Sequence, residues 1–178
     1  MNTKHILLVE DDPRDADLTL AALGDHDLAN KVFVVHDGAE ALDYLHCRAK
    51  FKARSGGNPI VILLDNKMPK VSRLEVLKDI KTDPYLKTIP VVVLTSSRET
   101  PDLIEFYQHG VNAYVVKPVK FEDFMKAVKQ LGIFWTAINE PPPHPTAGET
   151  LPAKGEALSP AIHEANHETA PAHPALGR

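Results

Sequence analysis

Five short runs rich in Val, Ile and Leu are spaced along the chain up to residue 118, and they constrain its fold more than any other feature. Most of the runs are apolar throughout rather than alternating, which is typical of strands buried on both faces of a parallel sheet. The runs are HILLVE (5–10), VFVVHD (32–37), IVILLD (60–65), PVVVLTS (90–96) and AYVVKP (113–118).

Segments with apolar residues at helical spacing lie between and after these runs. They occupy residues 16–23, 39–51, 74–80, 103–109 and 121–131. Strands that alternate with helices indicate an α/β fold with right-handed crossovers. We therefore predict a doubly wound, five-stranded parallel sheet of the flavodoxin-like type, with strand order 2-1-3-4-5. Asp12 and Pro13 are expected to cap and begin the first helix, and residues 51–59 to form a long loop.

The composition changes near residue 139. Eight of the 15 prolines and none of the aromatic residues fall within residues 139–178. A segment of this kind buries too little apolar surface to offset the entropy that is lost on folding. We predict one folded domain over residues 1–138, whose end at about 132–138 is an aromatic arm, followed by a disordered tail over residues 139–178.

Charge, cysteine content and the length of the apolar runs narrow the class of protein. The formal net charge is −4 and the pI is about 6.1, with no dominant basic patch, which argues against a nucleic-acid-binding protein. The one cysteine, Cys47, excludes an intramolecular disulfide and suits a reducing compartment. No apolar stretch is long enough for a signal peptide or a membrane span. We expect a cytoplasmic protein whose partners include neither a membrane nor a nucleic acid.

Polar residues end four of the five runs, at the edge where an open parallel sheet binds its ligands. They are Glu10, Asp11 and Asp12 after the first run, Asp65 after the third, Thr95, Ser96 and Ser97 after the fourth, and Lys117 after the fifth. Because the carboxyl ends of parallel strands meet at one edge, we expect carboxylates, a hydroxyl and an ammonium to converge there. Asp12 precedes Pro13 and is expected to cap a helix rather than to bind a metal.

This cluster favours metal-assisted phosphoryl chemistry. Carboxylates within a few ångströms repel one another unless a cation lies between them. Their oxygens suit a hard divalent ion such as magnesium, which takes a few carboxylates and keeps several waters. A magnesium beside Asp65 can bind an incoming phosphoryl oxygen while the carboxylate attacks phosphorus in line. Lys117 can pair with a phosphoryl oxygen or with the free carboxylate, and Thr95 can hydrogen-bond another oxygen.

Four segments resemble the signature segments of response-regulator receiver domains, over about residues 4–131. The segments are LLVEDDP, LLDNKMPK, VVLTSS and AYVVKP. The spacings also agree with the family, at 30 residues from Asp65 to Thr95 and 22 from Thr95 to Lys117. The resemblance implies a two-component signalling protein, not an enzyme. Such a protein accepts a phosphoryl group from a sensor histidine kinase and acts by conformational switching, docking or phosphorelay.

The resemblance also implies roles for single residues. Asp65 would be the phosphoacceptor. The ligands of a Mg²⁺ cofactor would be Glu10, Asp11, Asp65 and the backbone carbonyl of Lys67. Within the acidic pair Glu10 and Asp11, the resemblance favours Asp11 as the direct metal ligand.

Thr95 and Lys117 are implied to act on the phosphoryl group, and Thr95 and Tyr114 to form the switch that responds to it. Two positions depart from the family pattern. Arg73 stands where a glycine is usual, eight residues after the phosphoacceptor, and Asn66 stands where an apolar residue is common. A glycine would relax the backbone of this loop, so the family pattern does not fix the local geometry of the loop around Arg73. Neither departure removes a catalytic group.

A closer resemblance is to single-domain regulators that partner bacterial and cyanobacterial phytochromes. It rests on the long loop before the third strand, the segment DPYLKTIPVVVLTSS and the FW pair after the last helix. Gly132 is expected to stop that helix, and Phe134 and Trp135 then have no obvious place in the core. They either fold back on the protomer or bury against a second copy. The regulators that the chain resembles form dimers with crossing C-terminal arms, which favours a homodimer held by these two aromatics.

Three other functions are weighed against this one. A phosphohydrolase of the haloacid-dehalogenase type needs a second Asp two residues after the nucleophile, where this chain has Lys67. A dinucleotide-binding enzyme needs a glycine-rich first turn, whereas the acidic EDDPRD would repel a pyrophosphate. A pseudo-receiver that docks without taking phosphate stays open, although the complete set of active-site groups argues against it.

Overall fold

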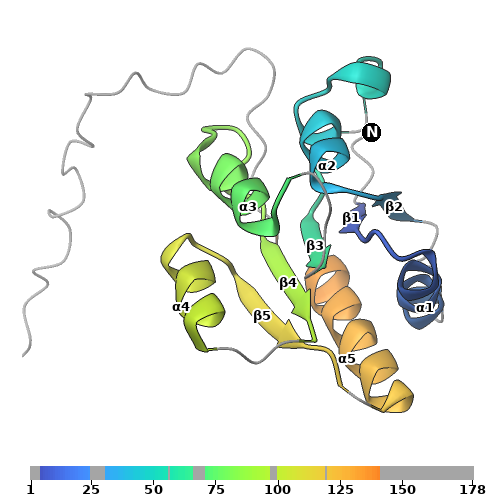
Figure 1. Ribbon diagram of the computed structural model, residues 1–178. Coiled ribbons are helices and arrows are strands. Elements are labelled where there is room, and N and C mark those ends of the chain that lie inside the picture. Colours follow the sequence, from blue (N-terminus) through green and yellow to red (C-terminus); the bar gives the residue numbers. More distant parts are fainter. Residues whose placement is uncertain are drawn as a thin grey trace, which may run out of the picture. The chain divides into compact units, whose positions relative to one another are not determined.

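The protein forms a five-stranded parallel sheet with strand order β2-β1-β3-β4-β5, which confirms the predicted topology (Figure 1). The structure is a computed structural model, and it describes residues 5–24, 31–55, 57–65, 71–96, 100–118 and 120–140. The strands are β1 (Ile6–Val9), β2 (Val32–Val35), β3 (Val61–Asp65), β4 (Val91–Thr95) and β5 (Ala113–Val116). Each strand lies within one of the five apolar runs.

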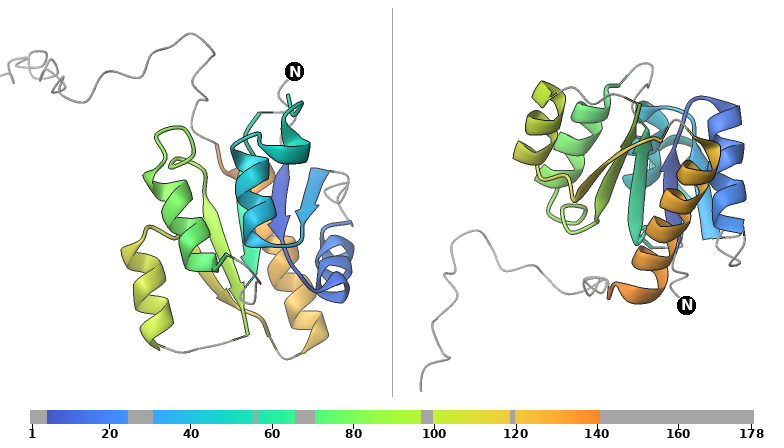
Figure 2. Two further views of the ribbon diagram at one scale, coloured as in Figure 1. Left: turned by 45° about the horizontal axis from the view of Figure 1, so that its top comes forward. Right: turned by 90° about the horizontal axis from the view of Figure 1, so that it is seen from below.

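Helices cover both faces of the sheet, with α1 and α5 on one face and α2, α3 and α4 on the other (Figure 1 and Figure 2). They are α1 (Pro13–Gly24), α2 (Gly38–Leu45), α3 (Arg73–Thr82), α4 (Thr100–Gln108) and α5 (Phe121–Ile133). This is the doubly wound arrangement that the alternating pattern predicts. Within the described ranges, no helix is long and apolar enough to cross a membrane.

The alternation of side chains along the strands divides the core into two layers. In β1, Leu7 and Val9 pack in the layer under α2, α3 and α4, whereas Ile6 and Leu8 pack in the layer under α1 and α5. The central strands β1, β3 and β4 are buried along their whole length, because helices cover both of their faces. The edge strands β2 and β5 are partly exposed.

The start of α1 agrees with the sequence pattern. The Arg14 backbone N–H donates a hydrogen bond to Asp12 Oδ1 at 2.8 Å, and Pro13 is the first residue of the helix. Proline suits this position because the first helical N–H has no partner within the helix. The prediction that Asp12 caps the helix is therefore confirmed.

The end of α2 differs from the sequence pattern, which predicts one helix over residues 39–51. In the structure α2 ends at Leu45, and a separate 3₁₀ turn, η2, covers Ala49–Phe51. Cys47 and Ala49 have φ angles of 52° and 46°, in the left-handed region that interrupts an α-helix. The prediction of a continuous helix is therefore wrong.

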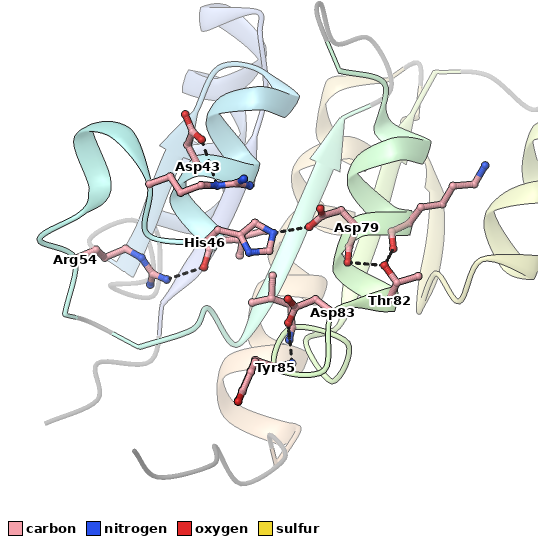
Figure 3. A network of polar contacts seen from close by, with 11 residues as sticks. Asp43, His46, Arg54, Asp79, Thr82, Asp83 and Tyr85 are labelled. Carbon is pink, nitrogen blue, oxygen red and sulfur yellow. Dashed lines mark hydrogen bonds and ion pairs between the residues drawn. The ribbon is translucent and has the colours of Figure 1, made fainter. Parts of the chain in front are cut away.

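A polar network joins the C-terminal ends of α2 and α3 (Figure 3). His46 Nε2 lies 2.6 Å from Asp79 Oδ1, across the gap between the two helices. Beyond α3, Asp83 Oδ1 accepts hydrogen bonds from the backbone N–H groups of Tyr85 and Leu86 at 2.7 and 3.0 Å. These contacts fix the turn that leads from α3 into β4.

The chain stays helical beyond Gly132. α5 ends at Ile133 and passes directly into a π-helical segment, η3 (Phe134–Ile138). Gly132 is buried, and its carbonyl accepts a hydrogen bond from the Thr136 hydroxyl at 2.7 Å, so the helical path continues through the glycine. The prediction that Gly132 stops the helix is therefore wrong. Residues 141–178 of the predicted tail lie outside the described residues.

Candidate functional site

Four polar side chains meet at the carboxyl ends of the strands. Glu10 follows β1, Asp65 and Thr95 end β3 and β4, and Lys117 follows β5. Glu10, Asp65 and Thr95 are 1%, 6% and 0% exposed, and they are three of the four buried polar residues in the described part of the chain. Burying polar groups costs free energy unless they are paired. Most of the buried polar side chains in the described residues lie together at this one edge of the sheet, where they can pair with one another.

Lys117 links the carboxylates of this edge. Its Nζ lies 2.7 Å from Asp65 Oδ1, 2.8 Å from Asp15 Oδ2 and 3.2 Å from Glu10 Oε2. Burial by itself lowers the pKa of the ammonium, but the hydrogen bonds to Asp15 and Asp65 outweigh it and hold this pKa above its ordinary value. The Lys117 backbone N–H also donates to the Thr95 carbonyl at 2.6 Å, which ties the end of β5 to the end of β4.

Asp15 belongs to this cluster although the sequence pattern does not single it out. It lies in the first turn of α1, where a carboxylate is also favoured by the helix N-terminus. That ordinary explanation hides its contact with Lys117. Its position in the sequence could have placed Asp15 at the site, because the first turn of a helix that follows a strand lies at the same sheet edge as the end of that strand.

Glu10 carries the largest electrostatic cost in the cluster. Burial raises the pKa of its carboxyl group, and repulsion from Asp65 raises it further, to about 7, against the opposing effect of Lys117. The backbone N–H of Asp12 donates to Glu10 Oε1 at 3.2 Å and partly offsets this cost. The site thus has more negative charge than its lysine balances.

Three carboxylates are placed to share a cation. Glu10, Asp11 and Asp65 each offer an oxygen, and these oxygens all lie within 4.8 Å of one another. Asp11 is exposed and the other two are buried, so the group is open to water on one side. A set of carboxylate oxygens suits a hard divalent ion, and the raised pKa of Glu10 agrees with a site that an added cation would stabilise. Lys67, expected to add a backbone carbonyl, lies outside the described residues.

A family model for the response regulator receiver domain matches residues 6–129. The chain belongs to this family. Two curated relatives agree with the assignment. The chain is 39% identical over 139 residues to the probable methanogenesis regulatory protein FilR2 of Methanothrix harundinacea, covering 77% of this chain and 86% of FilR2. It is 37% identical over 132 residues to the response regulator Rcp1 of Synechocystis, covering 74% of this chain and 88% of Rcp1.

Solved structures of response regulators, among them two named for phytochromes, have the same fold. The phosphorylated cyanobacterial phytochrome response regulator RcpA has a TM-score of 0.73 and 38% identity, over 79% of this chain and 99% of RcpA. The Mn²⁺-bound form of Rcp1 has a TM-score of 0.73 and 36% identity, with the same coverage. The bacteriophytochrome response regulator RtBRR is 58% identical, with a TM-score of 0.63, over 79% of this chain and 84% of RtBRR. The receiver thus resembles regulators that are linked to phytochromes.

Tyr114, the expected switch aromatic of the receiver, lies in β5 and is half-buried. Its ring packs against the ring of Phe106 from α4, with the ring centroids 5.9 Å apart. Its hydroxyl is buried and has no hydrogen-bond partner among the described residues. The role of Tyr114 in switching stays a prediction.

The two aromatics of the C-terminal arm have different environments. Trp135 packs against the core layer of α1 and α5, whereas Phe134 is 43% exposed. Their rings contact edge to face, with the centroids 4.9 Å apart. Trp135 therefore folds back on its own protomer, which is one of the two arrangements left open by the sequence. Phe134 stays accessible to a partner.

Arg73, which departs from the family pattern, starts α3 without disturbing the helix. Ser72 caps α3, and its side chain and Glu75 form a reciprocal capping box. The Arg73 guanidinium reaches across to α4, where Nη2 lies 2.5 Å from Asp102 Oδ2. The neighbouring departure, Asn66, lies outside the described residues.

Proposed function

We propose that this response regulator accepts a phosphoryl group on Asp65 in a Mg²⁺-dependent reaction and signals through the change of structure that follows. One observation carries the proposal: the Asp65 carboxylate lies at a buried junction of three strands, within reach of one ammonium and two further carboxylates. Membership of the receiver family supports a histidine kinase as the phosphoryl donor.

The chemistry assigned to Asp65 is nucleophilic. A carboxylate oxygen forms a bond to phosphorus while the bond from phosphorus to the imidazole nitrogen of the donor breaks, and the imidazole leaves with the electron pair. Bound at Glu10, Asp11 and Asp65, Mg²⁺ would supply charge neutralisation for the phosphoryl oxygens. The Mn²⁺-bound form of Rcp1 is a relative with a divalent ion, which supports this choice. The backbone carbonyl of Lys67 is a further proposed ligand.

Lys117 and Thr95 are proposed to read the phosphoryl group. Lys117 already contacts Asp65 Oδ1, so its ammonium can move to a phosphoryl oxygen with little displacement. Thr95 ends the neighbouring strand, where its hydroxyl can donate to another phosphoryl oxygen. Tyr114 lies in the adjacent strand and is proposed to rearrange with Thr95.

The proposed partner is a sensor histidine kinase, specifically a bacteriophytochrome, in the cytoplasm. The likeness to the phytochrome response regulators RcpA and RtBRR supports this choice. The receiver is assigned to residues 1–138, with its arm at about 132–138, and the remaining residues 139–178 to a separate tail. A receiver of this kind signals by docking to another protein or by passing the phosphoryl group on.

The test of the phosphoacceptor compares the full chain with Asp65→Asn. We expect radiolabelled acetyl phosphate to label the natural protein when Mg²⁺ is present and not when the metal is chelated. Asp65→Asn keeps the shape of the side chain but cannot form an acyl phosphate, so we expect no label. Robust labelling of the variant would refute the assignment. A folded natural protein that takes no label would instead favour a pseudo-receiver that acts only by docking.

We also propose that the receiver forms a homodimer through its C-terminal arm. Phe134 is exposed and carries a large ring, and large aromatics act as anchors in interfaces. The ring of Trp135 packs against the ring of Phe134 through the edge-to-face contact and so holds it in place. A two-fold arrangement would let the same arm serve both protomers.

The dimer is tested by sedimentation of the full chain over a range of concentrations. Replacing Phe134 and Trp135 together by Ala should weaken association by about 2–4 kcal/mol. Phe134→Ala alone separates the interface from the packing of Trp135 within the protomer. Tyr85→Ala is a matched control, because its side chain is exposed and lies in the turn before β4. A natural protein that remains monomeric at high concentration, with and without phosphorylation, would overturn the proposal.

A further inference from the structure

Arg73 ties the first turn of α3 to the first turn of α4. Its Nη2 lies 2.5 Å from Asp102 Oδ2, and the two side chains are 15% and 36% exposed. The pair is therefore partly shielded from water, unlike a pair between two freely exposed side chains. Charge-assisted hydrogen bonds in such surroundings are stronger and hold their geometry better than surface ion pairs.

The two partners have opposite relations to their own helices. Asp102 lies in the first turn of α4, where a negative charge is favourable at the helix N-terminus. Arg73 is the first residue of α3, where a positive charge is unfavourable for the same reason. Arg73 thus contributes nothing to the start of its own helix through its charge. Its charge is favourable in the ion pair with Asp102 of α4.

A second contact fixes α4 more firmly than the ion pair alone. The Arg73 guanidinium lies over the ring of Phe106, with Cζ 4.9 Å from the ring centroid. Asp102 and Phe106 are four residues apart, so they lie on the same side of α4, one turn after the other. Two contacts one turn apart restrain both the position of α4 along its axis and its rotation about that axis.

Phe106 connects this restraint to the sheet. It is 2% exposed and packs in the core layer under α2, α3 and α4. Its ring also contacts the ring of Tyr114 in β5, with the centroids 5.9 Å apart. A chain of direct contacts therefore runs from Arg73 through α4 to β5, the strand that Lys117 follows.

The restraint acts on the segment that follows Thr95. Only four residues, 96–99, separate Thr95 at the end of β4 from Thr100 at the start of α4. With so few residues between them, a displacement of Thr95 toward a phosphoryl group on Asp65 would be close enough along the chain to act on α4. In the structure Lys117 contacts Asp65 Oδ1 directly, and a phosphoryl group on Asp65 would compete for this contact.

We propose that Arg73 is a positioning residue of the switch, whose contacts with Asp102 and Phe106 stabilise α4 in the unphosphorylated arrangement and so slow phosphorylation of Asp65. The inference rests on the proposed function of Asp65. It adds a specific restraint on α4, built from one residue of α3 and two of α4. Arg73 acts through α4 and Tyr114.

The test measures the rate at which acetyl phosphate labels Asp65 in the full chain, with Mg²⁺ present. Arg73→Gln and Asp102→Asn should each raise this rate roughly two- to tenfold, because each removes the charged contact that holds α4. The double variant should be no faster than the faster single variant, since both changes remove the same interaction. Affinity for Mg²⁺ should not change, because neither residue belongs to the carboxylate group.

Arg48→Gln is the matched control, because it removes a surface ion pair of α2 that lies apart from α4. Arg48 Nε is 3.6 Å from Asp43 Oδ1, and both side chains are largely exposed. Its labelling rate should equal that of the natural protein. Arg73→Lys keeps the charge but loses the planar guanidinium, so it should give an intermediate labelling rate. This variant replaces Arg73→Gln in the test if Arg73→Gln does not fold.

A lower melting temperature with an unchanged labelling rate in Arg73→Gln and Asp102→Asn would overturn the inference, because it would show a purely structural pair. Slower labelling in both variants would overturn it as well. If the natural protein takes no label, the proposed function fails and the inference fails with it. If the natural protein is labelled and the variants equal it, the function stands and the inference alone fails.

Discussion

Two half-buried lysines lie at opposite ends of the sheet and show how differently one residue type can be used. Lys117 lies at the carboxyl ends of the strands, where its partners are the carboxylates of Glu10, Asp15 and Asp65. Lys81 lies at the amino ends of β4 and β5. Its Nζ donates to the carbonyls of Lys87 and Ile89 at 3.3 and 2.8 Å and to the side-chain oxygen of Asn112 at 3.0 Å.

The neighbours decide the electrostatics of each lysine. Burial lowers the pKa of Lys81, because its partners are neutral dipoles that do not restore the free energy of hydration. Burial also acts on Lys117, but there the carboxylates outweigh it and raise the pKa. Lys81 is therefore a fixed part of the scaffold, with every donor occupied by a neutral acceptor. Lys117 balances the negative charge of the carboxylates, which suits the proposed site of phosphorylation.

Lys117→Met, which removes the lysine at the carboxyl ends of the strands, should have the largest effect on function. Labelling of Asp65 should fall roughly 10²- to 10³-fold, because the variant loses the cation that contacts the reacting carboxylate. Affinity for Mg²⁺ should rise, since the ammonium no longer competes with the metal for Glu10 and Asp65. Labelling kinetics and a Mg²⁺ titration measure the two effects. An unchanged labelling rate would show that Lys117 only supports the fold.

Lys81→Met, which removes the lysine at the amino ends of β4 and β5, should change stability rather than function. The variant leaves two backbone carbonyls and the Asn112 side chain short of a donor, which should cost about 2 kcal/mol of unfolding free energy. Urea unfolding measures this loss. The rate of Asp65 labelling in the folded variant should equal that of the natural protein, and a large fall in that rate would contradict the assignment of Lys81 to the scaffold.

The smallest effect concerns the pH dependence of stability when metal is chelated. Burial raises the pKa of Glu10 to about 7 in the folded protein, whereas in the unfolded chain this pKa returns to its ordinary value of 4.5. The contribution of Glu10 to stability therefore falls as the pH rises through this window. Glu10→Gln mimics the protonated form, so its advantage in stability over the natural protein should grow as the pH rises from 5 to 8.

Urea unfolding of both proteins at the two pH values tests this prediction. Adding Mg²⁺ to the natural protein at the higher pH should recover stability, because the metal compensates the same carboxylate. The variant should gain less from the metal, because it lacks one of the three negative charges. Equal stability of the two proteins at both pH values would show that the Glu10 charge is already fully balanced.

The sheet and the location of the site were predictable because both follow from short-range patterns. Runs of Val, Ile and Leu set the strands, and parallel strands bring Glu10, Asp65, Thr95 and Lys117 to one edge. No side-chain contact has to be known for this step. The assignment of Asp12 to a cap was also local, since it depended on the proline that follows.

Features that depend on contacts between distant elements were not predictable in the same way. The break after α2 comes from left-handed backbone at Cys47 and Ala49, two residue types that rarely adopt it. Asp15 joined the site because α1 brings it to Lys117, over a hundred residues later in the chain. The contact of Arg73 with Asp102 likewise requires the packing of α3 beside α4. Sequence spacing records none of these distances.

The π-helical segment at Phe134–Ile138 makes the path of the chain sensitive to single-residue insertions and deletions. A π-turn holds one residue more than an α-turn, and here the Asn139 N–H donates to the Phe134 carbonyl, five residues earlier, at 2.7 Å. Deleting one residue would restore α-helical spacing and rotate the following side chains by about 100°. Two receivers with the same core could then present Ile138 to different neighbours. The number of residues in the arm, as well as their chemistry, thus determines the direction in which the side chains at the end of the arm point.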